Sequence, residues 1–391
     1  MNVRDRHPGG SGRQVVLSLL AVLALLAFAA ALALPLAFPV APAVHIHLAL
    51  AAGAMPLIIA AVSHFVPVLT RSRAAPAGIA GLGLLAAVAG LLAAGLFFRA
   101  DEGDLYIPAV AMLGIAGVMV LWMRRRARRA LGAPHPCLYW YAAALGCLML
   151  ALLAVVAMNV WPSQRFALRL FHLHLNLIGF IGLTGMGTLQ VLLPTVAGRF
   201  DPGVTARMRR GLPFSVAGTL LIAGGAAWLP WLAWGGVALW LVALVPIAAS
   251  WIRLYRREML RWHGAAPSLT AAFLGFFCVV AGGEAHAHGA LSYAAMGHLY
   301  VFAFLLPLVS GAVSHLLPLW LQGERTPAWH EEARRRLGTG GGLRGLLFLA
   351  AGLLAAAGWG GSFILALGGM FLVFAVLLWM RMTPAVAGAN L

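Results

Sequence analysis

Histidines recur at fixed distances from a proline in three apolar stretches of this 391-residue chain. His47, His174 and His298 each lie 20 residues before such a proline. His45 and His172 precede the first two of them by two residues, and the third stretch has a methionine at that place. An unpaired polar group in an apolar interior costs roughly 1–3 kcal/mol or more, so imidazoles repeated inside apolar segments are expected to bind a partner.

Two histidines separated by one residue cannot bind the same ion from a regular α-helix. Successive residues of the helix turn by about 100°, so side chains at i and i+2 diverge by roughly 200°. Neutral imidazole is a good ligand for haem iron and for copper. The pattern therefore predicts a helix placed between two cofactors, with one axial ligand for each of them.

The composition predicts an all-α, polytopic membrane protein. Hydrophobic residues make up 62% of the chain and charged residues 9%, and the mean hydropathy is +0.93. These values lie far from those of soluble globular domains. The net charge of +17 comes from arginine runs between apolar stretches, such as 124–129 and 334–336, and is not spread along one face. This pattern is typical of the positive-inside rule and argues against a nucleic-acid partner.

Apolar stretches of about 20 residues, long enough to cross a bilayer, predict twelve transmembrane helices. They lie near 14–36, 43–70, 76–98, 107–123, 137–161, 166–197, 212–229, 231–252, 267–286, 291–321, 342–360 and 362–381. Arginine-rich connections alternate with connections that carry Asp101, Glu102, Asp104 and Glu284. The alternation predicts a multi-pass protein of the bacterial inner membrane with both termini cytoplasmic and the first helix retained.

The second, sixth and tenth of these stretches align without a gap on Pro67, Pro194 and Pro318. Such a long-period repeat indicates a fold built from equivalent units. We therefore predict three pseudo-symmetric four-helix arcs flanked by cytoplasmic tails. Their ranges are 1–13 for the N-terminal tail, 14–130, 131–264 and 265–382 for the arcs, and 383–391 for the C-terminal tail.

The stretch HLHLNLIGFIGLTGMGTLQVLLPTV, residues 172–196, resembles the haem-ligand helix of the haem–copper oxidase superfamily, particularly of the cbb-type oxidases and nitric oxide reductases. The resemblance implies a subunit I-like fold of twelve helices in three arcs of four. It also implies that the HxH motif, His172 and His174, holds two haems back to back.

Two family features are missing. The apolar stretch near 212–229 has no adjacent histidine pair for copper, and no histidine is paired with a redox tyrosine. A conventional terminal oxidase is therefore not expected. In length, number of spans and histidine-rich helix ends the chain also resembles the compact haem- and copper-containing NnrS-type membrane proteins, which implies a link to nitric oxide.

The candidate haem ligands are His47, His174, His298 and His172. A bis-histidine haem would require two of the first three to face each other, and the sequence does not say which two. The segment GGEAHAHG places Glu284, His286 and His288 together, and His45 could join them in a copper or zinc site, because HxH can converge on one metal in an irregular turn. A polar interfacial loop is the alternative for this segment, and a second haem is the alternative for His45.

His64 and His315 form a possible inner site. Each lies 17 residues after an aligned histidine, which corresponds to about 25 Å of helix. Two helices that each carry an outer and an inner histidine are typical of transmembrane b-type cytochromes. The same 17 residues leave each outer and inner pair about 100° apart around the helix axis, so core or interfacial histidines are the alternative.

These patterns together predict a membrane haem protein that carries haem b, with copper or a second haem beside it. Its task would be electron transfer or the chemistry of nitric oxide or another diatomic gas. Beyond the lipid bilayer, the expected partners are the gas and an electron donor, either a periplasmic cytochrome c or cupredoxin or a quinol. The alternative is a transporter of copper or another metal that uses the layers of histidines as a pathway.

Overall fold

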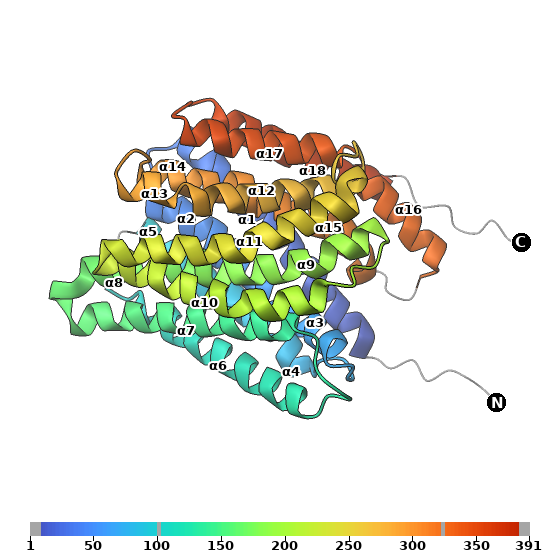
Figure 1. Cartoon of the computed structure of the whole chain (residues 1–391), viewed down its shortest axis with the longest axis horizontal. Coiled ribbons are helices and arrows are strands. Elements are labelled where there is room, and N and C mark those ends of the chain that lie inside the picture. The colour runs from blue at the N-terminus through green and yellow to red at the C-terminus, as the bar shows by residue number, and fades with distance from the viewer. Residues whose placement is uncertain (1–8, 100–102, 322–324, 383–391) are drawn as a thin grey trace, which may run out of the picture.

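The described part of the chain is entirely helical. The computed structural model describes residues 9–99, 103–321 and 325–382, and these form helices and no strands. The longer helices run side by side along the long axis of the molecule (Figure 1). Nine of the described helices are long and apolar enough to cross a membrane, and a tenth is obtained if a pair bent by 42° counts as one span. The expectation of an all-α, multi-pass membrane protein is confirmed.

The helices follow the order of the three sequence repeats. The first comprises α1 (Gly9–Ala37), α2 (Pro42–His47), η1 (Leu48–Ala54), α3 (Met55–Leu69), α4 (Ala77–Ala80), α5 (Leu82–Phe98) and α6 (Tyr106–Arg128). The second comprises α7 (Cys137–Val160), η2 (Pro162–Gln164), α8 (Arg165–His174), η3 (Leu175–Gly182), α9 (Leu183–Ala197), α10 (Val204–Ala227) and α11 (Pro230–Met259). The third comprises α12 (Ala266–Ala281), α13 (Gly283–Ala287), α14 (Tyr293–His298), η4 (Leu299–Leu305), α15 (Leu306–Leu321), α16 (Pro327–Leu337), α17 (Gly341–Ala356) and α18 (Ser362–Met382).

Three of the twelve expected spans differ from the others. The stretch near 342–360 is α17, which is long enough only together with α16, the bent pair. The stretch near 267–286 is divided, because α12 ends at Ala281 after 16 residues and α13 follows separately. The stretch near 212–229 belongs to α10, which begins with three arginines in its first two turns. The described structure thus supports nine or ten apolar spans.

The second long helix of each repeat contains a π-helical segment at the same place. These segments are η1, η3 and η4, and they begin directly after His47, His174 and His298. A π-helix bonds each N–H to the carbonyl five residues earlier, so the helix is wider there than in its α-helical parts. Such segments are rare and are frequent at functional sites. Their threefold recurrence shows that the repeat seen in the sequence is also a repeat in structure.

Each π-helical segment packs between two helices of its own repeat. η1 contacts α1 and α5, η3 contacts α7 and α10, and η4 contacts α12 and α17. The close approach requires glycine at two places. A Cβ on Gly90 would collide with the carbonyl of Ala51, and a Cβ on Gly275 would collide with the carbonyl of Ala303. Small residues at such crossings allow membrane helices to approach closely.

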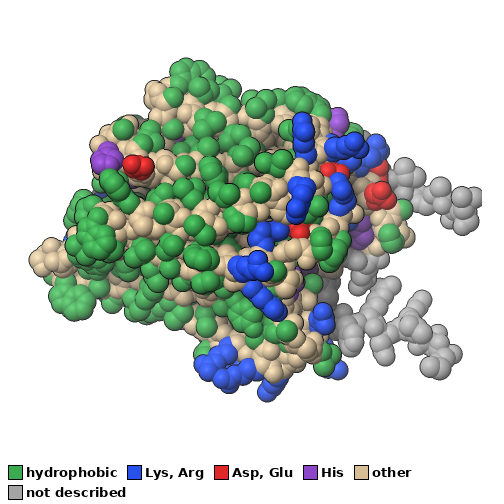
Figure 2. Space-filling view, in the orientation of Figure 1, with side chains coloured by type: hydrophobic (Ala, Val, Ile, Leu, Met, Phe, Trp, Pro, Cys, Tyr) green, Lys and Arg blue, Asp and Glu red, His purple; other side chains and the backbone are tan. Residues whose placement is uncertain are grey.

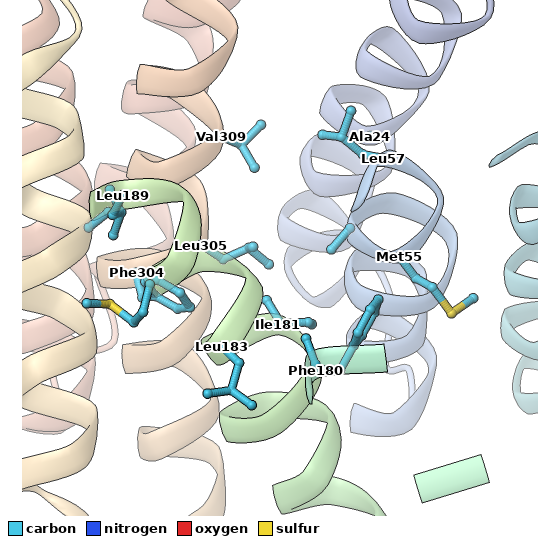
Figure 3. Packing of buried hydrophobic residues seen from close by; sticks show 14 of the residues in the cluster. Ala24, Met55, Leu57, Phe180, Ile181, Leu183, Leu189, Phe304, Leu305 and Val309 are labelled. Carbon is cyan, nitrogen blue, oxygen red and sulfur yellow. The ribbon is translucent and has the colours of Figure 1, made fainter. Parts of the chain in front are cut away.

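The repeats contact one another in a closed ring. α6 and α3 contact α7, α11 and α9 contact α12, and α18 and α15 contact α1. The middle of the bundle is filled by apolar side chains of all three repeats. Figure 3 shows Met55 and Leu57 with Phe180, Ile181 and Phe304, which belong to one buried cluster.

The two ends of the bundle carry different side chains. Arginines gather at the end that carries α16 and the start of α10, as Figure 2 shows for one face. We call this the arginine-rich end, defined by the arginines within 71–73, 124–129, 207–210, 253–261 and 334–336. The opposite end, where α2, α8 and α14 bring His45, His172 and His298, is called the histidine end. Three arginines belong to it, namely Arg99, Arg165 and Arg169.

Some of the expected polar segments cannot be placed. The C-terminal tail 383–391, residues 1–8 of the N-terminal tail, Asp101 and Glu102 lie outside the described residues. Residues 9–13 are not a separate tail, because α1 begins at Gly9.

The packing of η4 against α12 gives a first prediction. Gly275→Ala should lower the free energy of unfolding by about 1–3 kcal/mol, because the added methyl group overpacks the crossing with Ala303. Gly146→Ala in α7 is the matched control, since a Cβ there meets nothing within 4 Å and alanine favours a helix by up to about 1 kcal/mol. The measurement is the fraction of purified protein that stays monodisperse after heating. Equal thermal stability of the two variants would contradict this packing.

Candidate functional site

The three aligned histidines occupy one structural position, the last residue before a π-helical segment. His47 ends α2, His174 ends α8 and His298 ends α14. All three side chains are half-buried at the histidine end. The local fold therefore places three imidazoles at equivalent points around the ring of repeats.

Two of these imidazoles have a defined tautomer. Nδ1 of His47 lies 2.8 Å from the carbonyl oxygen of Ala43, and Nδ1 of His174 lies 2.8 Å from that of Leu170. A carbonyl can only accept, so each Nδ1 carries the proton and each Nε2 presents a lone pair. Metal-binding histidines usually have this arrangement, with the second ring nitrogen bound to a carbonyl or carboxylate.

His298 is held by aromatic rings instead. Its ring lies nearly parallel to that of Phe302, with centroids 5.4 Å apart and 12° between the planes. The ring of Phe363 meets it edge-on at 4.8 Å. These contacts fix the ring and leave its nitrogens without a protein hydrogen bond among the described residues.

The closest pair of histidines joins the third repeat to the first. The ring centroids of His45 and His298 are 6.5 Å apart, with 25° between the planes. Two imidazoles on opposite sides of one metal ion, with metal–nitrogen bonds of about 2.0 Å, would place their centroids roughly 6 Å apart. Nδ1 of His45 is buried and has no hydrogen-bond partner. The separation of the rings and the unsatisfied nitrogen of His45 are compatible with a shared metal ion.

Two further pairs lie at the other boundaries between repeats. His47 is close enough to His172 for an electrostatic interaction, and so is His174 to His286. Nδ1 of His172 bonds the carbonyl of Ala151 at 2.9 Å, and Nδ1 of His286 bonds that of Leu291 at 2.7 Å.

The two histidines of the HxH motif in the first repeat therefore have different neighbours, as the geometry of an α-helix predicts. The ring of His45 lies beside that of His298 of the third repeat, whereas His47 interacts electrostatically with His172 of the second. In each pair an aligned histidine of one repeat lies near another histidine of the next repeat around the ring. The pairs are His298 with His45, His47 with His172, and His174 with His286. They do not join two of His47, His174 and His298, which is the pairing that the sequence suggested.

The segment GGEAHAHG does not gather its polar side chains. It forms the short helix α13, so its two histidines point to different neighbours: His286 bonds Leu291, and His288 meets the ring of Trp234 at 5.3 Å. Glu284 and His288 are exposed. Within the described ranges, no three His, Cys, Asp or Glu side chains are arranged to hold one metal ion. The structure thus places His45 with His298 and His286 with His174.

The inner histidines contact other partners. The ring of His64 meets that of Trp320 edge-on at 6.2 Å, which links the first repeat to the third. The carbonyl of His315 accepts a hydrogen bond of 3.1 Å from Nε of Arg334. These contacts are those of packed side chains near the arginine-rich end.

Arg169 is a site residue that the sequence analysis did not single out. It interacts electrostatically with both His47 and His172. Its signal in the sequence is an arginine one turn before an HxH motif, within a helix that continues into the membrane. A guanidinium at this point can neutralise a carboxylate of a bound cofactor.

Two cavities lie at the opposite end of the molecule. One, of about 300 Å³, is lined by His135, Gln190 and Pro194. Burial, with the charge of Arg209 nearby, lowers the pKa of His135 below its ordinary value, so this imidazole is neutral at pH 7. The other, of about 620 Å³, lies between α10 and α11. Both cavities are separate from the histidine pairs.

Comparison with known proteins adds no family assignment. A scan against protein-family models finds no match for the chain, and no curated protein matches it.

The contact between His45 and His298 gives a second prediction. In a chain with its three native cysteines replaced by alanine, His45→Cys together with His298→Cys should be joined by a short bifunctional thiol reagent, because the two side chains face each other. The linked peptides are identified by mass spectrometry. His47→Cys with His298→Cys is the control, since residue 47 points to the other side of α2 and should stay unlinked. Equal linking in both chains would show that the pairing is wrong.

Proposed function

We propose that this chain is a membrane haem protein whose histidine end binds b-type haem and a second metal for electron transfer or for the chemistry of a diatomic gas. One observation carries the proposal: the rings of His45 and His298 lie 6.5 Å apart between two repeats, and at the other two boundaries a histidine of one repeat lies within electrostatic range of a histidine of the next. Ionisable residues inside membranes are costly and usually have a function, and histidine is the commonest protein ligand of metal ions.

His47 and His174 are the proposed haem ligands. Each has its Nδ1 proton held by a carbonyl, which leaves the lone pair of Nε2 free to bind a metal. His172 and His286, which lie within electrostatic range of them, are further candidates for holding the group. Arg169 would neutralise a carboxylate of that group beside His47 and His172. Bound haem would supply one-electron chemistry and the binding of a diatomic gas.

His45 and His298 are proposed to bind the second metal. Their separation and the unsatisfied Nδ1 of His45 suit an ion held between two imidazoles. Imidazole is a suitable ligand for copper, and a given nitrogen site generally binds Cu²⁺ more tightly than the other divalent first-row metal ions. With only two protein ligands this site differs from the one that His45, His286, His288 and Glu284 would have formed.

We further propose that α10, α12 and α17 complete a set of twelve spans in three arcs, as in subunit I of the haem–copper oxidase superfamily. The closed ring of contacts and the threefold recurrence of the π-helical segments support this arrangement. By the positive-inside rule the arginine-rich end would be cytoplasmic, and the histidine end would face the periplasm of a bacterial inner membrane. A periplasmic cytochrome c or cupredoxin, or a quinol, would then supply electrons.

Nitric oxide is favoured over oxygen as the gas. α10 corresponds to the helix that carries the copper-binding histidine pair in the oxidases, and it has no histidine. A site without that pair lacks the ligands with which those enzymes hold copper beside the haem, so a conventional terminal oxidase is not proposed.

A third prediction tests the haem. The purified protein, oxidised in air and then reduced with dithionite, should show the absorption bands of b-type haem, and nitric oxide should shift them. The double variant His47→Ala with His174→Ala should remove most of the absorbance, because it deletes the proposed haem ligand of each pair, and each single variant should lose only part of it. His288→Ala, an exposed histidine at the same end, is the matched control and should leave the spectrum unchanged. A colourless protein after expression with ample haem would reject the haem proposal and favour metal transport.

A fourth prediction separates the second metal from the haem. Copper counted per chain should fall to near zero in His45→Ala and in His298→Ala, while the haem absorbance of both variants persists. Copper retained in both variants would show that the His45–His298 pair is not the metal site. Loss of haem in His45→Ala would show instead that this pair holds the haem.

A further inference from the structure

The larger cavity at the arginine-rich end lies between the two helices of a hairpin. It measures about 620 Å³ and is formed by the start of α10, the end of α11 and the preceding loop. Three arginines line it, namely Arg207, Arg210 and Arg253. Its volume falls within the range of roughly 300–1,000 Å³ that is usual for small-molecule sites. Figure 2 shows basic side chains over this part of the surface.

One of the three arginines is mostly buried and is anchored by polar contacts. Arg207 pairs with the buried carboxylate of Asp201 at 2.6 Å and donates to the hydroxyl of Ser250 at 3.0 Å. Its Nε–H is buried and has no partner. The two paired nitrogens fix this guanidinium at the side of the cavity, where its charge is balanced by Asp201.

The other two arginines give the cavity a net positive charge. Asp201 neutralises Arg207, and no described acidic side chain forms an ion pair with Arg210 or Arg253. Both of these side chains are exposed at the mouth of the cavity. Two uncompensated guanidinium groups favour an anion with several oxygen acceptors, such as a phosphate group.

The rest of the wall is apolar. Phe214, Val242, Pro246 and Leu254 line the cavity, and the first two are 41% and 51% exposed on the outer surface of the bundle. Exposed apolar side chains on membrane-spanning helices face lipid, so the cavity has a polar end beside the arginines and an apolar side beside the acyl chains. A free phosphate ion would use only the polar end, whereas a phospholipid would use both.

We propose that this cavity is a binding site for an anionic phospholipid of the leaflet on the arginine-rich side. The phosphate would lie against Arg210 and Arg253, and an acyl chain would lie along Val242 and Pro246. Basic pockets between membrane helices bind anionic headgroups in this way. The site requires only that the chain spans a membrane, so it is independent of the proposed haem.

The test is native mass spectrometry of the full chain, purified in detergent and incubated with phosphatidylglycerol or phosphatidylcholine of identical acyl chains. The wild-type chain should retain one phosphatidylglycerol where phosphatidylcholine is lost. Arg210→Gln with Arg253→Gln should weaken that retention by roughly tenfold or more, since each arginine adds attraction for the anionic headgroup. Arg209→Gln with Arg257→Gln is the matched control, because it removes the same charge from the same two helices outside the cavity.

Each outcome has one meaning. Loss of phosphatidylglycerol in the cavity variant and its retention in the control variant support the site. Equal retention of the two lipids by the wild-type chain, or equal losses in both variants, would overturn it. If inorganic phosphate alone displaces the bound lipid at millimolar concentration, the ligand is free phosphate and the lipid assignment is wrong.

Discussion

The structure depends on the requirement that a backbone inside a membrane satisfies its own hydrogen bonds. The π-helical segments meet this requirement, because they keep the hydrogen bonds of a helix while widening it. Their extra width must be accommodated by the neighbours, and glycines such as Gly90 and Gly275 provide the space. The three segments thus have the same place and similar neighbours within their own repeats.

The same segments set the direction of the histidines. Each aligned histidine is the last α-helical residue before a π-helical segment, so its side chain has the same position in all three repeats. Since the repeats form a ring, the two histidines of an HxH motif reach two different boundaries. The pairs of His45 with His298 and of His47 with His172 follow from this arrangement.

The division of charge between the two ends gives each end its own chemistry. Neutral imidazoles with Nδ1 bound to carbonyls are suited to soft or borderline metal ions. Guanidinium groups at the other end are suited to phosphate oxygens. Arg169 is the exception, since it lies among the histidines and interacts with two of them. The proposed cofactor site and the proposed lipid site therefore require no shared residue.

The sequence by itself determined the helical class, most of the spans and the threefold repeat of His47, His174 and His298, because hydrophobic length and residue spacing are local properties. It also determined that His45 and His47 diverge, since that follows from the pitch of an α-helix. It did not reveal the π-helical segments. One of them lies between His47 and His64, so the rotation of about 100° per residue of a regular α-helix does not hold for the whole distance between these residues. It also did not reveal which histidines meet. Only the tertiary structure decided that, because the pairs form between repeats and depend on how the repeats pack into a ring.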